Sequence, residues 1–356
     1  MSTCPACRIA VIAGDGIGRE VTPAALHVLT EASRRAGFAI ETVAFPWSCD
    51  YYRETGRMMP PTGLDELRSF DAIFLGAIGA PSVPDHVSVW ELILPIRQRF
   101  EQYVNLRPMR LMPGVRSPLA AATPETLDMV CVRENSEGEY AGLGGRLHRG
   151  TPHEVAEQTG LFTRVGIERV VRYAFARART RPRRLLASAT KSNALQHSMV
   201  LWDEVVDGVK ADYPDVTVRR YHVDALAARM VTAPATLDVI VASNLFGDIL
   251  TDLGAAVSGS LGIAPGANLN PERRFPSMFE PIHGSAPDIA GRGIANPIGA
   301  IWAGALLLEH LGQAESAERI VAAIERVLRE GRVLTPDLGG RASTRDVTAA
   351  VLEALA

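Results

Sequence analysis

The printed sequence alternates short apolar segments with segments in which apolar residues recur three or four positions apart. The short segments are rich in β-branched residues and end at turn residues, which predicts buried strands, whereas the longer spacing predicts amphipathic helices. We predict strands at 8–13, 39–45, 71–76, 104–110, 127–132, 184–189, 216–223 and 237–241. We predict helices at 20–36, 63–69, 90–100, 164–179, 244–254, 298–311, 314–329 and 343–356. Strands and helices that alternate in this way indicate an α/β protein with a largely parallel sheet.

Two segments do not follow this pattern. Residues 142–158 are rich in Gly, Arg and His and contain few apolar residues. Such a segment cannot form a core of its own, so we expect a protruding arm that is ordered only by a second subunit. Residues 255–297 are rich in Gly, Pro and Asn and are expected to form a loop. A loop of that length in a compact domain usually serves a function.

The segment 236–254 carries the first candidate site. A predicted buried strand is followed by a helix for which Asn244 is the expected N-cap, and Asp248 and Asp252 leave one face of that helix. An isolated pair of this kind is usually a solvated acidic surface. Here the pair directly follows a buried strand, where open α/β sheets place their ligands, and apolar residues flank it. Two carboxylates in that position favour Mg²⁺ or Mn²⁺.

The basic residues add a candidate base. Lys and Arg together number 37, and only Lys191 and Lys210 are lysines. Arg cannot release its proton, whereas Lys can when its surroundings lower its pKa. Lys210 lies in a polar segment and is expected at the surface, but Lys191 follows a predicted strand, as does Asp224. Strand ends of a parallel sheet share one edge, so we expect both residues in the same crevice as the aspartate pair.

Three arginines indicate the kind of ligand. Arg97, Arg107 and Arg133 each lie in or beside an apolar element. One such arginine is usually a surface residue. Three together suggest a pocket that holds a small dianion by bidentate pairs.

Size and charge exclude other classes. A chain of 356 residues is long for one core, so two domains are expected. The net charge of −3 gives no reason to expect nucleic acid or an anionic membrane as a partner. No apolar run approaches the ~20 residues of a membrane span, so we expect a cytoplasmic protein.

Two short motifs were considered and set aside. Cys4 and Cys7 resemble half of a zinc site with no second half, and are interpreted as incidental. The Gly14–Gly18 turn fails the Rossmann fingerprint, since Arg19 stands where a glycine is needed.

Several longer motifs, in this order, resemble the β-decarboxylating dehydrogenases, which include the isocitrate, isopropylmalate, homoisocitrate, tartrate and D-malate enzymes. The motifs are Gly-Asp-Gly-Ile-Gly at 14–18, Asn-Leu-Arg-Pro at 105–108, Arg-Glu-Asn-Ser-Glu-Gly-Glu-Tyr at 133–140, Asn-Leu-Phe-Gly-Asp-Ile-Leu at 244–250 and His-Gly-Ser-Ala-Pro-Asp at 283–288. The resemblance covers nearly the whole chain. It implies an isocitrate/isopropylmalate dehydrogenase-like α/β fold in which two domains share a mixed sheet, and not a Rossmann fold. The cofactor domain would comprise 1–102 and 259–356, and the substrate domain 103–258, with an arm at about 142–163.

The resemblance also implies residue roles. Arg97, Arg107 and Arg133 would bind the substrate carboxylates. Asp248 and Asp252 would ligate Mg²⁺ or Mn²⁺ together with Asp224 of a neighbouring subunit, so the protein would be a homodimer or higher homo-oligomer with shared sites. Lys191, also from the neighbour, would act at the substrate hydroxyl, and Tyr140 would protonate the enol product. The cofactor would be held by His283, Gly284, Ser285, Ala286, Asp288 and Asn296. A K⁺ requirement is suggested only by the resemblance.

Cofactor and substrate follow from single positions. A carboxylate at Asp288 suits a ribose 2′-hydroxyl and repels a 2′-phosphate, and the NADP-using isocitrate relatives have Lys and Tyr where this chain has Asp288 and Ile289. We therefore expect NAD. Isopropylmalate enzymes have Glu where this chain has Trp90. Isocitrate enzymes have Ser and Asn where this chain has Glu91 and Ile93.

The segments 84–90, 101–107 and 270–276 most resemble the D-malate and tartrate enzymes. The expected reaction is the NAD-dependent oxidative decarboxylation of D-malate to pyruvate and CO₂, with tartrate as a second substrate. Two alternatives are 3-isopropylmalate oxidation and, from another class, a non-catalytic regulatory subunit. The regulatory subunits of the family typically lose a metal ligand, the Lys or the Tyr, and this chain keeps all of them.

Overall fold

The computed structural model describes residues 6–355, so Cys4, one of the two cysteines interpreted as incidental, lies outside the described residues. Ten strands form one sheet in the order β2-β1-β3-β12-β11-β4-β5-β10-β8-β9, and β6 and β7 form a separate hairpin. The strands are β1 (Cys7–Gly14), β2 (Ile40–Ala44), β3 (Ala72–Ala77), β4 (Val104–Arg110), β5 (Asp128–Glu134), β6 (Gly138–Leu147), β7 (Val155–Leu161), β8 (Leu185–Thr190), β9 (Thr217–His222), β10 (Val239–Ala242), β11 (Pro265–Leu269) and β12 (Ser277–Pro281).

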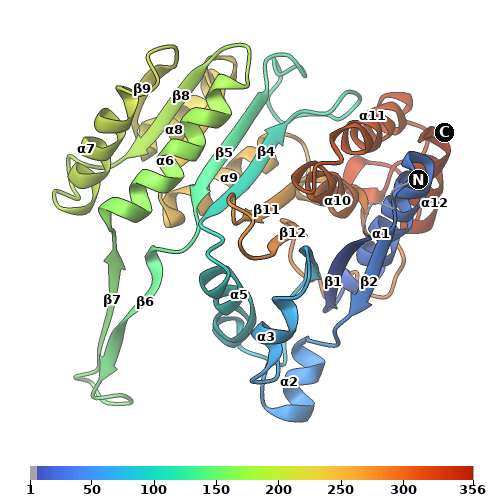
Figure 1. The fold of residues 1–356 in the computed structure, drawn as a ribbon, viewed down its shortest axis with the longest axis horizontal. Helices are drawn as coiled ribbons and strands as arrows, with labels where there is room; N and C mark the ends of the chain where they lie inside the picture. The colour runs from blue at the N-terminus through green and yellow to red at the C-terminus, as the bar shows by residue number, and fades with distance from the viewer. Residues whose placement is uncertain (1–5, 356) are drawn as a thin grey trace.

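Helices cover both faces of this sheet (Figure 1). They are α1 (Gly18–Ala36), α2 (Cys49–Thr55), α3 (Gly63–Leu67), α4 (Asp85–Ser88), α5 (Leu94–Arg99), α6 (Arg164–Arg179), α7 (Ser198–Lys210), α8 (Val223–Thr232), α9 (Asn244–Val257), α10 (Ile298–His310), α11 (Ala314–Glu330) and α12 (Thr344–Ala354). A π-helical turn, η1 (Val89–Ile93), joins α4 to α5, and short 3₁₀ turns lie at Pro234–Thr236, Leu261–Ile263 and Pro336–Leu338. No helix in the described part of the chain is long and apolar enough to span a membrane.

The sheet consists of two parallel blocks that run in opposite directions. Strands β2, β1, β3 and β12 are mutually parallel, and so are β5, β10, β8 and β9. The blocks meet at β11 and β4, which form antiparallel ladders with each other and with β12 and β5. The sheet is therefore mixed, as predicted. It also continues across the predicted domain boundary, since β4 and β11 come from different predicted domains.

Strand alternation gives the two faces of the sheet different cores. On one face a single continuous core contains Val11, Phe74, Val132 and Val241 and packs against α1, α6, α7, α10, α11 and α12. The other face carries two separate cores. One lies under α2, α3 and α5, and the other lies under α8 and α9. The first of these cores reaches Met278 of β12 and the second reaches Met109 of β4 and Cys131 of β5, whereas no residue of β11 belongs to either. The gap between the two cores therefore lies at the middle of the sheet, around β11.

That gap is lined with polar residues. Val104 and Leu106 of β4 belong to the continuous core, so Asn105 and Arg107 point to the opposite face. The same alternation directs the buried side chains of Arg133, Asn268 and Glu280 to that face. Buried polar side chains are costly unless they are hydrogen-bonded or bind a ligand, so this gap is the candidate site.

Three differences from the predicted elements bear on the site. The predicted loop 255–297 contains β11 and β12, which complete the middle of the sheet although they are short and lack an apolar alternation. The segment after β9 is helix α8, so Asp224 lies in the first turn of a helix that the sequence did not predict. The N-cap of α9 is Ser243, and the prediction for Asn244 is wrong, because its buried side chain binds Arg133 instead of the helix end.

The predicted arm is present as a β-hairpin. Strands β6 and β7 pair antiparallel and extend away from the body of the protein (Figure 1). Leu147 and Val155 near its tip are 66% and 55% exposed, although both are large apolar residues. Exposed apolar side chains on an isolated two-stranded hairpin favour an interaction with another chain, since such a hairpin is marginally stable alone.

One prediction concerns acid stability. Burial, assisted by the guanidinium of Arg273, lowers the pKa of His310 to about 4, and its ring packs 5.6 Å from that of Phe279. Between the usual value of 6.5 and about 4, the unfolded chain binds a proton that the folded chain does not. This contribution to stability is therefore complete above pH 6.5 and is lost as the pH falls toward 4. His310→Gln should destabilise the protein less, relative to wild type, at pH 5 than at pH 7.5 in urea unfolding. An equal difference at both pH values would contradict the prediction.

Candidate active site

The structure brings Arg97, Arg107 and Arg133 together in the gap between the two smaller cores. Arg97 comes from α5, Arg107 from the middle of β4 and Arg133 from the carboxyl end of β5. All three are buried. Three guanidinium groups that share one buried region repel each other, so the site needs negative partners.

Arg133 is the most deeply buried of the three, at 2% exposure. Its Nε and Nη2 donate to the Asn244 side-chain oxygen at 3.0 and 2.7 Å, and its Nη1 forms an ion pair with Asp248. Burial, with the charge of Arg107, lowers the pKa of Arg133 to about 10, so the group stays charged at neutral pH. Gly247 lies directly against the side chain of Arg133: a Cβ at this position would be 2.5 Å from the arginine Cγ.

The aspartate pair lies beside these arginines. Asp248 accepts from the Tyr140 hydroxyl at 2.9 Å, and Asp252 lies 3.6 Å from Nη1 of Arg107. Burial raises the pKa of Asp248, but the nearby arginines and the tyrosine hydroxyl outweigh it, and the net direction is down. Burial raises the pKa of Asp252, and the charge of Asp248 adds to this. Burial and Asp248 also raise the pKa of Tyr140, so the phenol keeps its proton at neutral pH.

Lys191 and Asp224 pair with each other and not with this group. Lys191 follows β8 directly, and its Nζ donates to Asp224 at 2.7 Å. This bond lowers the pKa of Asp224. Among residues 6–355, Asp224 does not lie close enough to Asp248 and Asp252 for the three carboxylates to hold one metal ion. Within one chain the expected crevice is therefore divided into two parts.

The carboxylates fit a hard divalent cation only in part. Asp248 and Asp252 project from one face of α9 and offer oxygen ligands of the kind that Mg²⁺ and Mn²⁺ prefer. Among residues 6–355 no three His, Cys, Asp or Glu side chains of one chain are grouped closely enough to hold a metal ion. A complete site of this kind needs ligands from the substrate, from water or from another chain.

The glycine turn after β1 positions a second region. Gly16 adopts a φ of 50°, and a Cβ there would lie 2.0 Å from the Ser285 carbonyl oxygen. This carbonyl accepts from the Ile17 backbone N–H at 2.9 Å. The turn therefore holds the 283–288 loop in place. A groove of about 610 Å³ runs between this loop and residues 78–85 and is lined by Gly79, Gly284, Ser285, Ala286 and Pro287, among others.

Of the remaining candidate cofactor residues, His283 and Asp288 belong to this loop and Asn296 lies just before α10. His283 is partly buried, which lowers the pKa of its ring, and its Nε2 has no hydrogen-bond partner among the described residues. Asp288 is exposed, as an interaction with a ribose would require. Asn296 is buried and bonded to Asp337 and to the first backbone N–H of α10. The region fits a nucleotide-sized ligand with a polar end.

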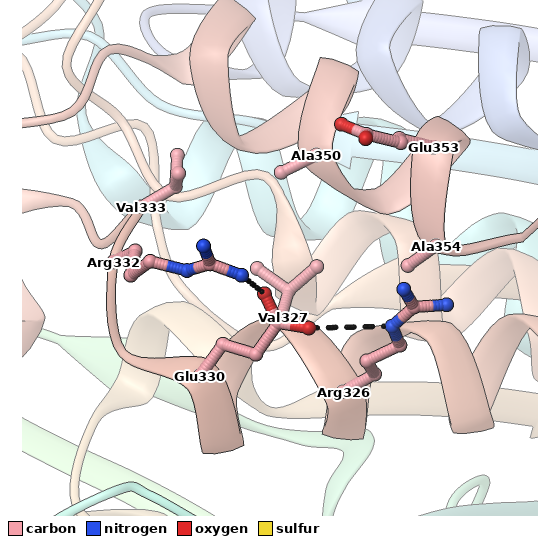
Figure 2. A pocket seen from close by; sticks show the side chains of 8 residues that line it. All are labelled: Arg326, Val327, Glu330, Arg332, Val333, Ala350, Glu353 and Ala354. Carbon is pink, nitrogen blue, oxygen red and sulfur yellow. Dashed lines mark hydrogen bonds and ion pairs between the residues drawn. The ribbon is translucent and has the colours of Figure 1, made fainter.

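A further hollow lies elsewhere and is not part of this site. It lies between α11 and α12 and has a volume of about 300 Å³. Figure 2 shows the side chains that line it. Glu330 pairs there with both Arg326 and Arg332, so the charges of the lining are largely balanced. None of the predicted site residues lines it.

Sequence reasoning missed four polar residues of the gap, Asn105, Asn244, Asn268 and Glu280. Glu280 accepts from Arg97 at 2.9 Å and from Asn268 at 2.8 Å. Asn105 accepts from Arg107 at 2.8 Å. The alternation of side chains along a strand could have identified Asn105. It lies two positions before Arg107 in the same strand, so both side chains point to the same face of the sheet.

Gly247 provides a test of the packing around Arg133. Alanine normally stabilises a helix interior by ~1 kcal/mol relative to glycine. Gly208, in α7, has open space where a Cβ would lie, so Gly208→Ala should raise the free energy of unfolding. Gly247→Ala should lower it, because the new methyl group displaces Arg133 from Asn244 and Asp248. Urea unfolding of both variants measures this, and stabilisation by both would show that the site tolerates a shift of Arg133.

Comparison with known proteins agrees with this geometry. A chain described as a probable tartrate dehydrogenase/decarboxylase from Agrobacterium vitis is 57% identical over 350 residues, which cover 98% of this chain and 96% of the relative. D-malate dehydrogenase (decarboxylating) of Escherichia coli K12 is 53% identical, with 97% of both chains covered. Tartrate dehydrogenase/decarboxylase of Pseudomonas putida is 51% identical, with 98% of both covered.

Among solved structures, isocitrate dehydrogenase from Methylococcus capsulatus superimposes with a TM-score of 0.88 at 35% identity, covering 98% of this chain and 99% of that one. The family model for isocitrate/isopropylmalate dehydrogenases matches residues 8–351. The match therefore includes both parallel blocks of the sheet, the arm and the gap with its three arginines. The chain belongs to the isocitrate/isopropylmalate dehydrogenase family, as the sequence motifs predicted.

Proposed function

We propose that the protein catalyses the NAD-dependent oxidative decarboxylation of D-malate to pyruvate and CO₂ and accepts tartrate in the same site. The observation that carries the proposal is the convergence of Arg97, Arg107 and Arg133 on the Asp248–Asp252 pair. Three buried guanidinium groups suit the two carboxylates of a small dianion, and the adjacent aspartates suit a divalent cation beside its hydroxyl. Relatives described as tartrate and D-malate dehydrogenases support this substrate class.

The residues of the chain then have distinct tasks. The arginines orient the substrate between them. Mg²⁺ or Mn²⁺, held by Asp248 and Asp252, would supply Lewis-acid stabilisation of the negative charge that develops on the substrate oxygen. Lys191 takes the proton of the substrate hydroxyl, which is general-base catalysis. NAD⁺, when bound, would supply the hydride acceptor. Tyr140 holds its proton at neutral pH and donates it to the enolate that remains after CO₂ departs.

The choice of NAD rests on the 283–288 loop. His283, Gly284, Ser285, Ala286 and Asn296 would hold the adenosine half. Asp288 is exposed and acidic, which favours a ribose 2′-hydroxyl over a 2′-phosphate. A requirement for K⁺ remains an expectation from the family resemblance.

Trp90 supports a small substrate. It lies on the π-helical turn before α5, seven positions ahead of Arg97, and is 40% exposed. The base of the arm packs against it, since a Cβ on Gly142 would be 3.0 Å from its ring. A bulky ring in this position leaves room for hydrogen or hydroxyl on the neighbouring substrate carbon and disfavours an isopropyl group.

We further propose that the active site is shared between two chains and that each chain has two domains, 1–102 with 259–356 and 103–258. The separation of the Lys191–Asp224 pair from Tyr140, Asp248 and Asp252 supports sharing. So does Ile249, which lies between the two aspartates on α9 and is 59% exposed. An exposed apolar residue next to the catalytic carboxylates is expected where a second subunit packs.

Purified protein with Mn²⁺ and K⁺ tests the proposed reaction. NADH formation should be fastest with D-malate, present with L-(+)- or meso-tartrate, and at least ~10-fold slower with 3-isopropylmalate, the effect expected of a pocket that lacks room for the extra methyl groups. NADP⁺ should be a poor substitute for NAD⁺. Turnover of 3-isopropylmalate as fast as D-malate, or no turnover of any of these acids, would overturn the proposal.

The role of Lys191 as the base is tested by Lys191→Arg. This variant keeps the charge and should lose at least ~100-fold in kcat, the usual contribution of a general base.

Subunit sharing is tested by complementation. Lys191→Met and Asp248→Asn should each be nearly inactive as homodimers. After they are unfolded and refolded together, a mixed dimer carries both substitutions in one site and neither in the other. Random pairing makes about half of the dimers mixed, so recovered activity should approach roughly a quarter of wild type if the sites act independently. Mixed dimers as inactive as their parents would show that each chain forms its own site.

A further inference from the structure

A chain of buried side chains connects Arg97 to Arg107. Arg97 Nη2 donates to Glu280 at 2.9 Å, and the Asn268 amide donates to the same carboxylate oxygen at 2.8 Å. The Asn105 amide donates to the Asn268 oxygen at 2.8 Å, and the Asn105 oxygen accepts from Arg107 Nε at 2.8 Å. Every member is at least nine-tenths buried.

The strand register aligns this chain across the middle of the sheet. Asn268 of β11 is directly opposite Asn105 of β4, and Asn105 is directly opposite Arg133 of β5. Directly opposite residues share a face of an antiparallel pair, so their side chains meet. The chain therefore crosses the junction of the two parallel blocks, from Glu280 in β12 to Arg107 in β4.

The charges at its two ends determine the orientation of both amides. A guanidinium can only donate, so Asn105 must present its oxygen to Arg107, which leaves its NH₂ for Asn268. An ionised carboxylate can only accept, so Asn268 must present its NH₂ to Glu280, which leaves its oxygen for Asn105. Asn135 also donates to the Asn268 oxygen, at 3.0 Å. Both ends therefore impose the same single arrangement, and no amide can flip without loss of a buried bond.

We propose that Asn105, Asn268 and Glu280 are positioning residues that hold Arg97 and Arg107 at a fixed separation for the two carboxylates of the substrate. This inference rests on the proposed function, in which both arginines bind the substrate. Arg97 and Glu280 lie in one predicted domain and Arg107 lies in the other, so the chain sets the distance between groups that could otherwise move apart. Loss of any link releases one arginine relative to the other.

The test uses Asn105→Ala, Asn268→Ala and the double variant, assayed with D-malate and NAD⁺. Each single variant should raise the KM for D-malate about 10- to 100-fold, the range for loss of a hydrogen bond to a charged group. The kcat should fall less than the KM rises, and the KM for NAD⁺ should stay within about 2-fold, because substrate positioning and not chemistry is affected. The double variant should be no worse than the worse single variant, since one broken link already uncouples the arginines.

Asn270→Ala is the matched control. Asn270 is equally buried and follows β11, but its side chain bonds only to backbone groups of Glu101, Arg274 and Phe275. The Asn270→Ala substitution should lower thermal stability and leave the KM for D-malate within about 2-fold of wild type. If an alanine variant does not fold, Asn105→Asp and Asn268→Asp keep the size, break one link each and should show the same pattern.

Three results would overturn the proposal. An unchanged KM in folded variants would show that the arginines are held by other contacts. A double variant whose KM increase is the product of the single increases would show two independent structural effects. Loss of folding in both the alanine and the aspartate sets would show that the chain serves the stability of the sheet. If wild-type protein oxidises neither D-malate nor tartrate, the proposed function fails, but the positioning role can still be tested. Calorimetry then measures the Kd of malonate, a small dicarboxylate, for the same variants. The Kd should increase in the variants in which the KM for D-malate was expected to increase.

Discussion

Arg133 carries a full positive charge at a position that water hardly reaches, and the rest of the cleft balances that charge. A buried ion without partners is costly, and breaking such a pair by removing one partner typically costs about 3–5 kcal/mol. Asn244 and Asp248 supply the partners, and Gly247 leaves the space between them. Because all three lie in the first two turns of α9, the same helix that neutralises Arg133 also presents Asp252. One local sequence thus positions Arg133 and the aspartate pair together.

The position of the cleft follows from how the hydrophobic core is divided. One face of the sheet packs against a continuous hydrophobic core that includes residues of both parallel blocks. The other face has two cores with a gap over the antiparallel junction. Polar strand residues in that gap are shielded from water by the flanking cores, which strengthens their electrostatic interactions. The 283–288 loop, which we propose binds the cofactor, follows β12 directly, so Glu280 lies only a few residues from His283.

Much of this architecture could be predicted from the sequence. The strands with an apolar alternation, the long helices and the three arginines were all visible in periodicity and composition. The family followed from motifs, and the similarity to known relatives confirms it. The arm was recognisable because residues 142–158 lack the apolar residues needed for a core, although its hairpin structure was not. Strands β11 and β12 were missed because partners on both sides, and not their own sequence, make them strands. For the same reason the roles of Asn268 and Glu280 could not be predicted, since their neighbours are distant in the chain.

The division of the site between chains is the claim on which the mechanism depends most. It is tested most directly by a crystal structure of the Lys191→Met variant with Mn²⁺ and D-malate, in which the metal is located by its anomalous scattering. We expect the anomalous peak between Asp248 and Asp252 of one chain and Asp224 of the neighbouring chain, with the substrate carboxylates on Arg97, Arg107 and Arg133. A peak ligated by Asp224 of the same chain, or one away from the Asp248–Asp252 pair, would contradict this arrangement.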